Sequence, residues 1–296
     1  MLLYNYWARV SLDCQRGDGQ PYHLVGYGGS DDSPGAARAA GQALLQARRA
    51  RLQAGEPLGQ YPTTARPLRE QLEQRLYDRQ GELLAAITRN GYGSRVLNAP
   101  RVVFIDVDDK DLCPSPGLSG WEALLGPRLY GWLLRQLGGA PPVACAPDVV
   151  MAQRLSAWLD GHPDWKIRLY RTRRGYRLLA LHQLLPPDSP VVHAAFAALG
   201  ADAVYARLCQ TQQCYRARLS PKPWRIGWHR PPVVFPFETD AEAATQHAWE
   251  QQYAHRSQRF SVCEGLGDFG TGTSCPEAQQ VADVHDAACL GGRPLA

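Results

Sequence analysis

Two aspartates stand two residues apart where an apolar run of the sequence ends. Residues 101–113 read RVVFIDVDDKDLC, so Asp106 and Asp108 follow the apolar run at 102–105. On a β-strand, side chains at i and i+2 point to the same face, which would place these two carboxylates close together. Neighbouring carboxylates repel each other unless a cation neutralises them, and bound Mg²⁺ or Mn²⁺ can then handle phosphate groups. The spacing predicts a catalytic divalent-metal site at Asp106 and Asp108, with an acidic exit from strand to loop as the alternative.

Arginines gather in a second segment, RLYRTRRGYRLLALH at residues 168–182. Its alternating pattern predicts a β-hairpin that turns around 173–175, where a glycine permits the tight turn. Arginine and hydroxyl groups along one hairpin suit contacts to phosphate or to a nucleic-acid backbone. We expect such contacts from Arg168, Arg171, Thr172 and Arg177. The alternative is an exposed hairpin whose arginines pair with acids elsewhere in the chain.

A third segment, YRARLSPKPWRIG at residues 215–227, combines basic residues with prolines and a tryptophan. Arg216 and Arg218 would share one strand face, and Lys222 stands between two prolines close to Trp224. A stiff basic loop with an aromatic ring can hold a phosphate or stack a base. The alternative is a loop whose tryptophan packs into the core.

The charge of the chain is unevenly distributed. The 296 residues carry a net charge of +4, yet residues 166–230 hold twelve Lys and Arg residues against two acids, and the remainder is acidic. A basic segment within an acidic chain indicates a surface for an anionic partner, with a nucleotide or nucleic acid as the leading candidate.

The elements expected to position these residues alternate between strands and helices. The patterns predict an α+β fold, a mostly antiparallel sheet with flanking helices. We expect a main domain over 1–260, with a possible subdomain break near 70–80, and a loosely attached C-terminal tail with a short helix over 261–296. The predicted elements are strands near 4–30, 84–88, 95–97 and 102–107, the hairpin at 168–182, and helices beginning near 34, 69, 119, 147, 190 and 240. The second helix is based on Leu68, Leu72 and Leu76, spaced at i, i+4 and i+8.

The eight cysteines form no CxxC pair, which favours buried or free thiols in a cytosolic chain. A structural zinc site that combines Cys209, Cys214, Cys263 or Cys275 with a histidine is the alternative. The single histidines His182, His229 and His285 have no ligand-spaced partner and are interpreted as structural.

The hydropathy of the chain predicts no membrane segment. No window of about 18 uncharged apolar residues occurs, and the first residues, MLLYNYWARV, are typical of a strand rather than of a signal peptide. We therefore expect a cytoplasmic protein that does not interact with membranes.

The strings RLYRTRRGYR and RARLSPKPWR resemble an uncharacterised bacterial family. More distantly, the order of elements is similar to the archaeo-eukaryotic primase and primase-polymerase superfamily. That resemblance implies a primase-polymerase-like core in which Asp106 and Asp108 match the acidic strand motif and Arg216–Lys222 the later basic segment. Arg177 stands where the superfamily has a histidine that contacts nucleotide phosphates, and Asp188 is a candidate for its third acid.

These features predict a protein that binds a nucleotide or nucleic acid and that acts, if catalytic, as a nucleotidyltransferase dependent on Mg²⁺ or Mn²⁺. Arginine at position 177 would then preserve phosphate binding where catalysis is lost. Two alternatives are a non-catalytic nucleic-acid-binding accessory protein and a protein-interaction module in which the basic and acidic regions meet each other.

Overall fold

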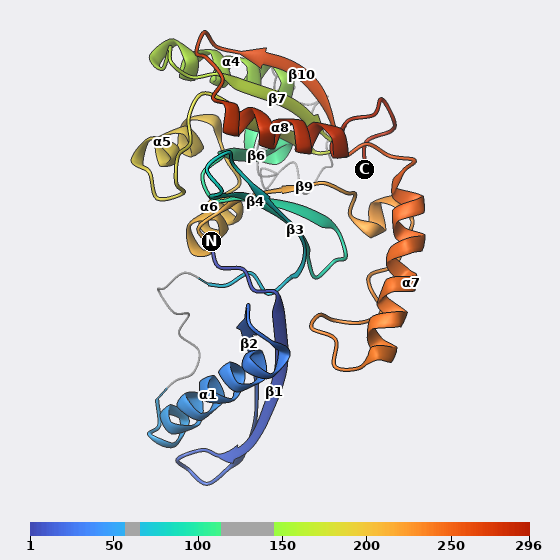
Figure 1. Ribbon diagram of the computed structural model, residues 1–296. Helices are drawn as coiled ribbons and strands as arrows, with labels where there is room; N and C mark the ends of the chain where they lie inside the picture. Colours follow the sequence, from blue (N-terminus) through green and yellow to red (C-terminus); the bar gives the residue numbers. More distant parts are fainter. Residues whose placement is uncertain (57–65, 114–144) are drawn as a thin grey trace, which may run out of the picture.

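The computed structural model describes residues 1–56, 66–113 and 145–296 (Figure 1). The fold is α+β, as predicted, and every pairing between its named strands is antiparallel. Three sheets form, with the orders β1-β2, β3-β4-β5-β9 and β10-β7-β8-β6. The helix predicted near 119–138 lies outside the described residues.

The N-terminal strands and the first helix pack together at one end of the molecule (Figure 1). β1 (Tyr6–Gln15) and β2 (Pro21–Ser30) form a hairpin, which α1 (Pro34–Gln53) covers. The Ser33 hydroxyl caps α1 by accepting the backbone N–H of Ala36, and a proline occupies the first helical position. Gly28 allows the close packing, because a Cβ there would lie 2.1 Å from the Ala37 carbonyl oxygen of α1.

The second sheet contains a strand where a helix was predicted. It consists of β3 (Gln71–Tyr77), β4 (Leu83–Arg89), β5 (Arg95–Ala99) and β9 (Tyr215–Arg218). The prediction of a helix beginning near residue 69 was wrong, because β3 occupies this segment. Leu72 and Leu76 are four residues apart, a spacing that a strand shares with a helix, and a β-bulge between Leu72 and Gln74 interrupts the strict alternation that marks a strand.

The third sheet carries the predicted acidic strand and the predicted hairpin. Its strands are β6 (Phe104–Asp108), β7 (Ile167–Thr172), β8 (Gly175–Ala180) and β10 (Cys263–Phe269). Gly175 ends the β7–β8 turn and stands opposite Asp108 in the register. A Cβ at Gly175 would lie 2.0 Å from the Val107 carbonyl oxygen, so the turn can approach β6 only with glycine at this position.

The helices surround these two larger sheets. Gly200, at a φ of 80°, ends α5, and the helix predicted to begin near 190 is therefore two helices. The named helices after α1 are α2 (Asp109–Leu112), α4 (Pro147–Gly161), α5 (Pro190–Leu199), α6 (Ala203–Gln212), the 3₁₀ helix η1 (Pro223–Ile226), α7 (Asp240–Ser257) and α8 (Pro276–Cys289).

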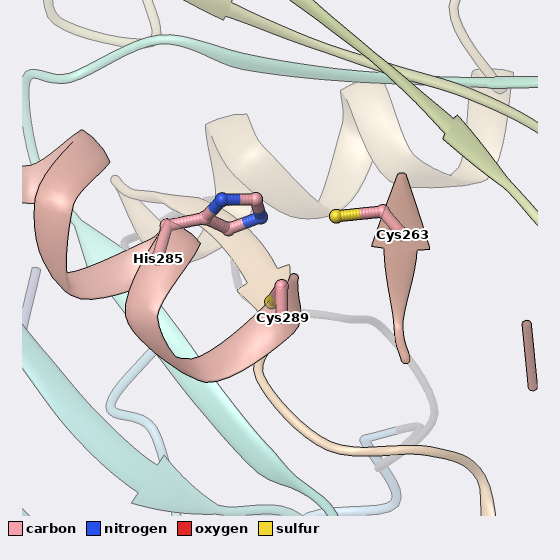
Figure 2. Close-up of side chains that lie close together, drawn as sticks. All are labelled: Cys263, His285 and Cys289. Carbon is pink, nitrogen blue, oxygen red and sulfur yellow. The ribbon is translucent and has the colours of Figure 1, made fainter. Parts of the chain in front are cut away.

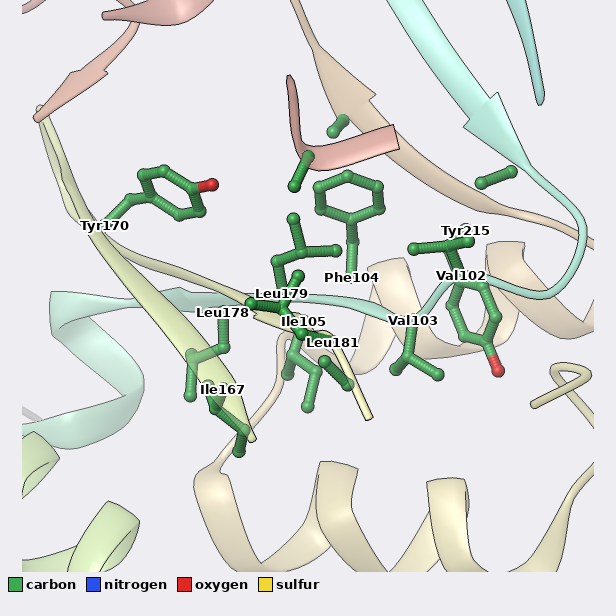
Figure 3. Packing of buried hydrophobic residues seen from close by; sticks show 14 of the residues in the cluster. Val102, Val103, Phe104, Ile105, Ile167, Tyr170, Leu178, Leu179, Leu181 and Tyr215 are labelled. Carbon is green, nitrogen blue, oxygen red and sulfur yellow. The ribbon is translucent and has the colours of Figure 1, made fainter. Parts of the chain in front are cut away.

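The main hydrophobic core lies around β6, β7 and β8 (Figure 3). Phe104, Ile105, Leu178 and Leu179 are each at most 1 % exposed and pack with side chains from the surrounding helices. Burial of such side chains stabilises the fold by about 1.5–3 kcal/mol each. The acidic end of β6 is thus anchored on a rigid part of the molecule.

Residues 261–296, expected to be loosely attached, pack against this core. β10 pairs along the whole length of β7, and Ala278, Val281 and Ala282 of α8 are fully buried. Within β10, Gly265 and Gly267 flank a β-bulge.

The state of the cysteines and the character of the helices can be compared with the predictions from the sequence. Cys113 and Cys145 form a disulfide, whereas the other six cysteines are free thiols. Their separation of 32 residues gives no local sequence signal. Among the residues that the structure describes, no helix has the length and apolar character needed to cross a bilayer.

Candidate phosphate-binding and metal site

Three carboxylates from three elements meet at the end of β6. Asp108 ends that strand, Asp111 belongs to α2, and Asp202 is the N-cap of α6. Oxygen atoms of the three carboxylates lie within 4.8 Å of one another. We call these three residues the acidic triad. Because a cluster of carboxylate oxygens is the donor set of hard divalent cations, the triad could hold a metal ion.

Hydrogen bonds hold Asp202 beside β6. Its backbone N–H donates to the Asp106 carbonyl oxygen (3.0 Å), while its carboxylate accepts the Tyr205 backbone N–H (2.7 Å) as the cap of α6. The start of α6 is thereby tied to the strand that carries Asp108. The triad depends on this contact between segments far apart in the chain.

Lys110 supplies a positive charge at the acidic triad. Its ammonium group lies 3.4 Å from an oxygen of Asp108 and 3.6 Å from one of Asp202. Asp111 first, and then Asp108, raise the pKa of this exposed lysine. The ammonium group therefore occupies the place where the carboxylates attract a cation, and a bound metal ion would compete with it.

Asp106, the other aspartate of the predicted pair, has a different partner. Its carboxylate oxygen Oδ1 accepts a hydrogen bond from Nε of Arg177 at 2.9 Å, across the β6–β8 pairing. Asp106 is not a member of the acidic triad. The structure thus divides the predicted pair between a candidate metal site and an internal ion pair.

Arg177 is fully enclosed, with a side chain only 1 % exposed. Its Nη1 donates to the Arg218 carbonyl oxygen and contacts Nε2 of His285, both at 3.1 Å. Burial opposes the charge, but the Asp106 carboxylate outweighs it and raises the pKa of the guanidinium above the ordinary arginine value. Arg177 therefore remains a cation but presents no surface to a phosphate, contrary to our expectation from the sequence.

A group of basic side chains lies within electrostatic reach of Asp106 and Asp108. Arg218 ends β9, Lys222 precedes η1, and Arg225 lies within η1. Burial lowers the pKa of Lys222, and the neighbouring Arg218 and Arg225 lower it further. Burial lowers the pKa of Arg225 as well, and the nearby Arg218, Arg173 and Arg174 lower it further. We call Arg218, Lys222 and Arg225 the basic cluster.

The basic cluster lacks carboxylate partners within the described residues. No ion pair within 4.0 Å joins any of its members to an acid there, while Asp106 and Asp108 attract Lys222 from farther away. Burial likewise lowers the pKa of Arg218 against the opposing attraction of Asp106. An anion would stabilise these partly buried cations, because it would offset their mutual repulsion. The basic cluster therefore favours binding of an anion such as a phosphate group.

An exposed aromatic pair adjoins the basic cluster. The rings of Tyr92 and Trp224 meet edge to face with centroids 5.3 Å apart, and they are 43 % and 45 % exposed. Lys222 and Arg230 lie over the Trp224 ring at 5.6 Å and 5.3 Å. Trp224 therefore does not pack into the core, and its ring surface is open to a ligand.

The remaining residues predicted to bind phosphate are used within the fold. Arg168 pairs with Asp268 (2.6 Å) and Asp286 (2.9 Å). Arg171 holds Asp109 through two hydrogen bonds, and Arg216 pairs with Glu70. Thr172 ends β7 opposite Gly175 and Cys263. Arg168 and Arg171 pair with acids, as the alternative interpretation of the hairpin stated, and Arg216 does so although no such alternative was considered for it.

The site contains residues that the sequence did not single out as ligands. Asp202 is a functional candidate because its backbone N–H donates to the Asp106 carbonyl oxygen of β6, and Arg225 because its charge interacts with those of Arg218 and Asp108. Asp202 stands between the glycine that ends α5 and the first residue of α6, the position of an N-cap, and this signal could have marked the start of a second helix. Asp188, our candidate for a third acid, is not in the triad.

A cavity elsewhere on the molecule is separate from this site. It has a volume of about 980 Å³ and lies between α4 and the β7–β10 edge. Met151, Leu155 and Phe269 are among its lining residues, whereas no member of the acidic triad or the basic cluster lines it.

Comparison of the chain with protein-family models, with curated proteins and with solved structures found no match. The resemblance to the primase-polymerase superfamily therefore stays a prediction. The residues of the acidic triad and the basic cluster carry the functional assignment.

Proposed function

We propose that the protein binds the phosphate groups of a nucleotide or of single-stranded nucleic acid at the basic cluster. The observation that carries this proposal is the presence of three partly buried cations, unpaired with carboxylates among the described residues, within electrostatic reach of Asp108 of the acidic triad. A phosphate between the two groups would relieve the repulsion among Arg218, Lys222 and Arg225. It would also reach any cation held by the acids.

The acidic triad would hold Mg²⁺ or Mn²⁺ at this phosphate. Both ions prefer carboxylate oxygens, and a bound ion would neutralise charge on the phosphate oxygens and so make the phosphorus easier for a nucleophile to attack. Asp108, Asp111 and Asp202 would bind the ion, while Arg218 and Lys222 would hold the phosphate against it. Such an arrangement supports nucleotidyl transfer, in which catalysis consists mainly of positioning and charge stabilisation.

The aromatic pair would contribute to base recognition. A nucleobase can stack on the open face of Trp224 while its phosphate reaches Lys222, because the lysine ammonium lies 5.6 Å from the Trp224 ring centre. Stacking on an aromatic side chain tolerates any base. The proposed ligand is thus a nucleotide or a single strand, whose bases are free to stack.

Non-catalytic binding is the second candidate function, and the buried ion pair favours it. Arg177 engages Asp106, so one of the two strand-end carboxylates already has a protein cation as its partner. Binding would then use the same basic cluster without turnover. The two candidates differ only in whether the acidic triad performs chemistry.

Binding can be tested by fluorescence anisotropy with labelled single-stranded DNA and RNA at several salt concentrations. We expect Arg218→Gln and Lys222→Ala to weaken binding of all sequences to a similar extent and to lower the salt slope by about one each. Arg38→Ala is the matched control, because Arg38 is an exposed arginine of α1, which packs on the β1–β2 hairpin (Figure 1). Equal losses in the control, or none in the basic-cluster variants, would reject the proposed surface.

Catalysis requires a separate assay. Labelled nucleotides offered with Mg²⁺ or Mn²⁺ on primed and unprimed templates should be incorporated by the wild type and not by the Asp108→Asn, Asp202→Asn double variant. Failure of the wild type with every nucleotide and both metals, together with retained binding, would leave the accessory-protein function.

A further inference from the structure

Two thiols and an imidazole converge beneath the candidate site. Cys263 begins β10, and His285 and Cys289 lie one turn apart on α8. Figure 2 shows the imidazole ring directed toward the Cys263 sulfur, with Cys289 on the next turn of the helix. One ligand atom from each residue lies within 4.8 Å of the other two, and all three side chains are buried. Two sulfurs and one ring nitrogen form the donor set of zinc sites.

The neighbours of His285 fix its protonation. Nδ1 lies 2.9 Å from the Asp286 carboxylate, which can only accept, and Nε2 lies 3.1 Å from Arg177, which can only donate. The ring is therefore neutral, with its proton on Nδ1 and a lone pair on Nε2. A carboxylate that holds the Nδ1 proton, so that Nε2 carries the lone pair, is the arrangement found behind zinc-binding histidines.

We propose that Cys263, His285 and Cys289 form a binding site for zinc, distinct from the acidic triad. Three protein ligands leave one position of a tetrahedral ion for a water molecule. The two sites select different cations, since thiolate and imidazole favour Zn²⁺ whereas carboxylates favour Mg²⁺ or Mn²⁺.

Charge and protons balance at the proposed site. The Cys289 thiol donates to the Arg218 carbonyl oxygen at 3.4 Å and must lose this proton to solvent when zinc binds. The Cys263 thiol must likewise lose its proton to solvent. Two thiolates would neutralise Zn²⁺. To free Nε2 of His285 for the ion, Nη1 of Arg177 would have to move away from it, while Nε of Arg177 could keep its hydrogen bond to Asp106.

Zinc at this place would connect the C-terminal segment to the proposed function. It would cross-link β10 to α8 directly behind Arg177, the residue that holds Asp106 in β6. Loss of zinc should therefore loosen the C-terminal helix first. The basic cluster and the acidic triad do not depend on the ion as ligands.

Metal analysis of the purified full-length protein tests the proposal. We expect about one zinc per chain in the wild type and in Cys209→Ala, and little in Cys263→Ala or Cys289→Ala. Cys209 is the matched control, because it is a free thiol only 1 % exposed that lies outside the cluster. Asp286→Asn, which leaves all three ligands in place, should weaken zinc binding by roughly 10- to 100-fold.

Cobalt titration of the metal-free wild type provides a readout that does not depend on the folding of variants. The expected spectrum has the strong visible bands of four-coordinate cobalt together with sulfur-to-cobalt charge transfer. The proposal is overturned by the weak bands of six-coordinate cobalt, by zinc retained in Cys263→Ala, or by a folded wild type that binds no zinc. Mass spectrometry that finds Cys263 joined to Cys289 in a disulfide, in a protein without metal, would likewise overturn it.

Discussion

Asp106 and Arg177 form an ion pair in which the cation is completely enclosed. The guanidinium Nε lies 2.9 Å from the carboxylate oxygen. The Asp106 side chain is 26 % exposed and the Arg177 side chain 1 %. The pair joins β6 to β8 beneath the acidic triad. Because the cation has no access to water, the structure depends on the presence of the acid.

Removal of the acid should destabilise the fold strongly. Asp106→Asn leaves Arg177 charged and buried, and we expect the free energy of unfolding to fall by about 3–5 kcal/mol. Asp268→Asn makes the same chemical change at the more exposed pair with Arg168 and should cost about 1 kcal/mol or less. Urea unfolding followed by circular dichroism measures both. Equal losses in the two variants would contradict the structural role of the Asp106–Arg177 pair.

The acidic triad should bind Mn²⁺ through Asp202. Asp202→Asn removes one ligand charge, yet asparagine caps helices as well as aspartate does, so α6 should keep its N-terminus. We expect weaker Mn²⁺ binding by electron paramagnetic resonance and an unchanged unfolding midpoint. Asp188→Asn, outside the triad, is the control and should bind Mn²⁺ as the wild type does.

Phosphate binding should depend on pH through Lys222. Burial and the neighbouring arginines lower the pKa of this lysine in the free protein, so it begins to lose its proton at a lower pH than an ordinary lysine with a pKa of about 10.4. A bound phosphate favours the charged form. Affinity should therefore be greatest at the lower pH and fall as the pH rises through the lowered pKa.

Lys222→Arg supplies the comparison for this pH dependence. Arginine keeps its charge throughout the same range, so the variant should bind with less dependence on pH. Anisotropy measured between neutral and alkaline pH distinguishes the two curves. A wild-type curve that matches that of the variant would show that another group titrates.

Trp224 should contribute stacking energy to nucleic-acid binding. Trp224→Ala removes the exposed ring and should weaken binding of a single strand by about 1–3 kcal/mol, while Trp224→Phe should retain much of the affinity. The test compares both variants with an oligonucleotide and with its abasic analogue. If the loss is as large for the abasic strand, the ring does not stack on a base.

The sequence was sufficient for local features of this site. An apolar run predicted a strand at 102–107, which the structure places at Phe104–Asp108, and a glycine flanked by strand patterns predicted the β7–β8 turn. Both predictions are confirmed because strand periodicity and turn chemistry depend on neighbouring residues. The four-residue spacing of leucines near β3 led to the wrong prediction of a helix, because a β-bulge in that strand interrupts its alternation.

Contacts between charged residues that are far apart in the chain could not be predicted from sequence patterns. Arg168 and Arg216 looked like phosphate ligands, but their carboxylate partners Asp286 and Glu70 lie far away in the chain. The same holds for Asp202, which tertiary packing brings to Asp108. Whether an arginine binds a ligand or an internal acid is decided by the register and packing of whole elements.

The most direct test of the central claim is calorimetric titration of ATP into the protein with and without Mn²⁺. If the acidic triad and the basic cluster share one phosphate, Mn²⁺ should increase the affinity for ATP in the wild type and not in Asp202→Asn, whereas Arg218→Gln should weaken binding under both conditions. An ATP affinity that is the same with and without Mn²⁺, and that is unchanged in Arg218→Gln, would contradict a shared phosphate site.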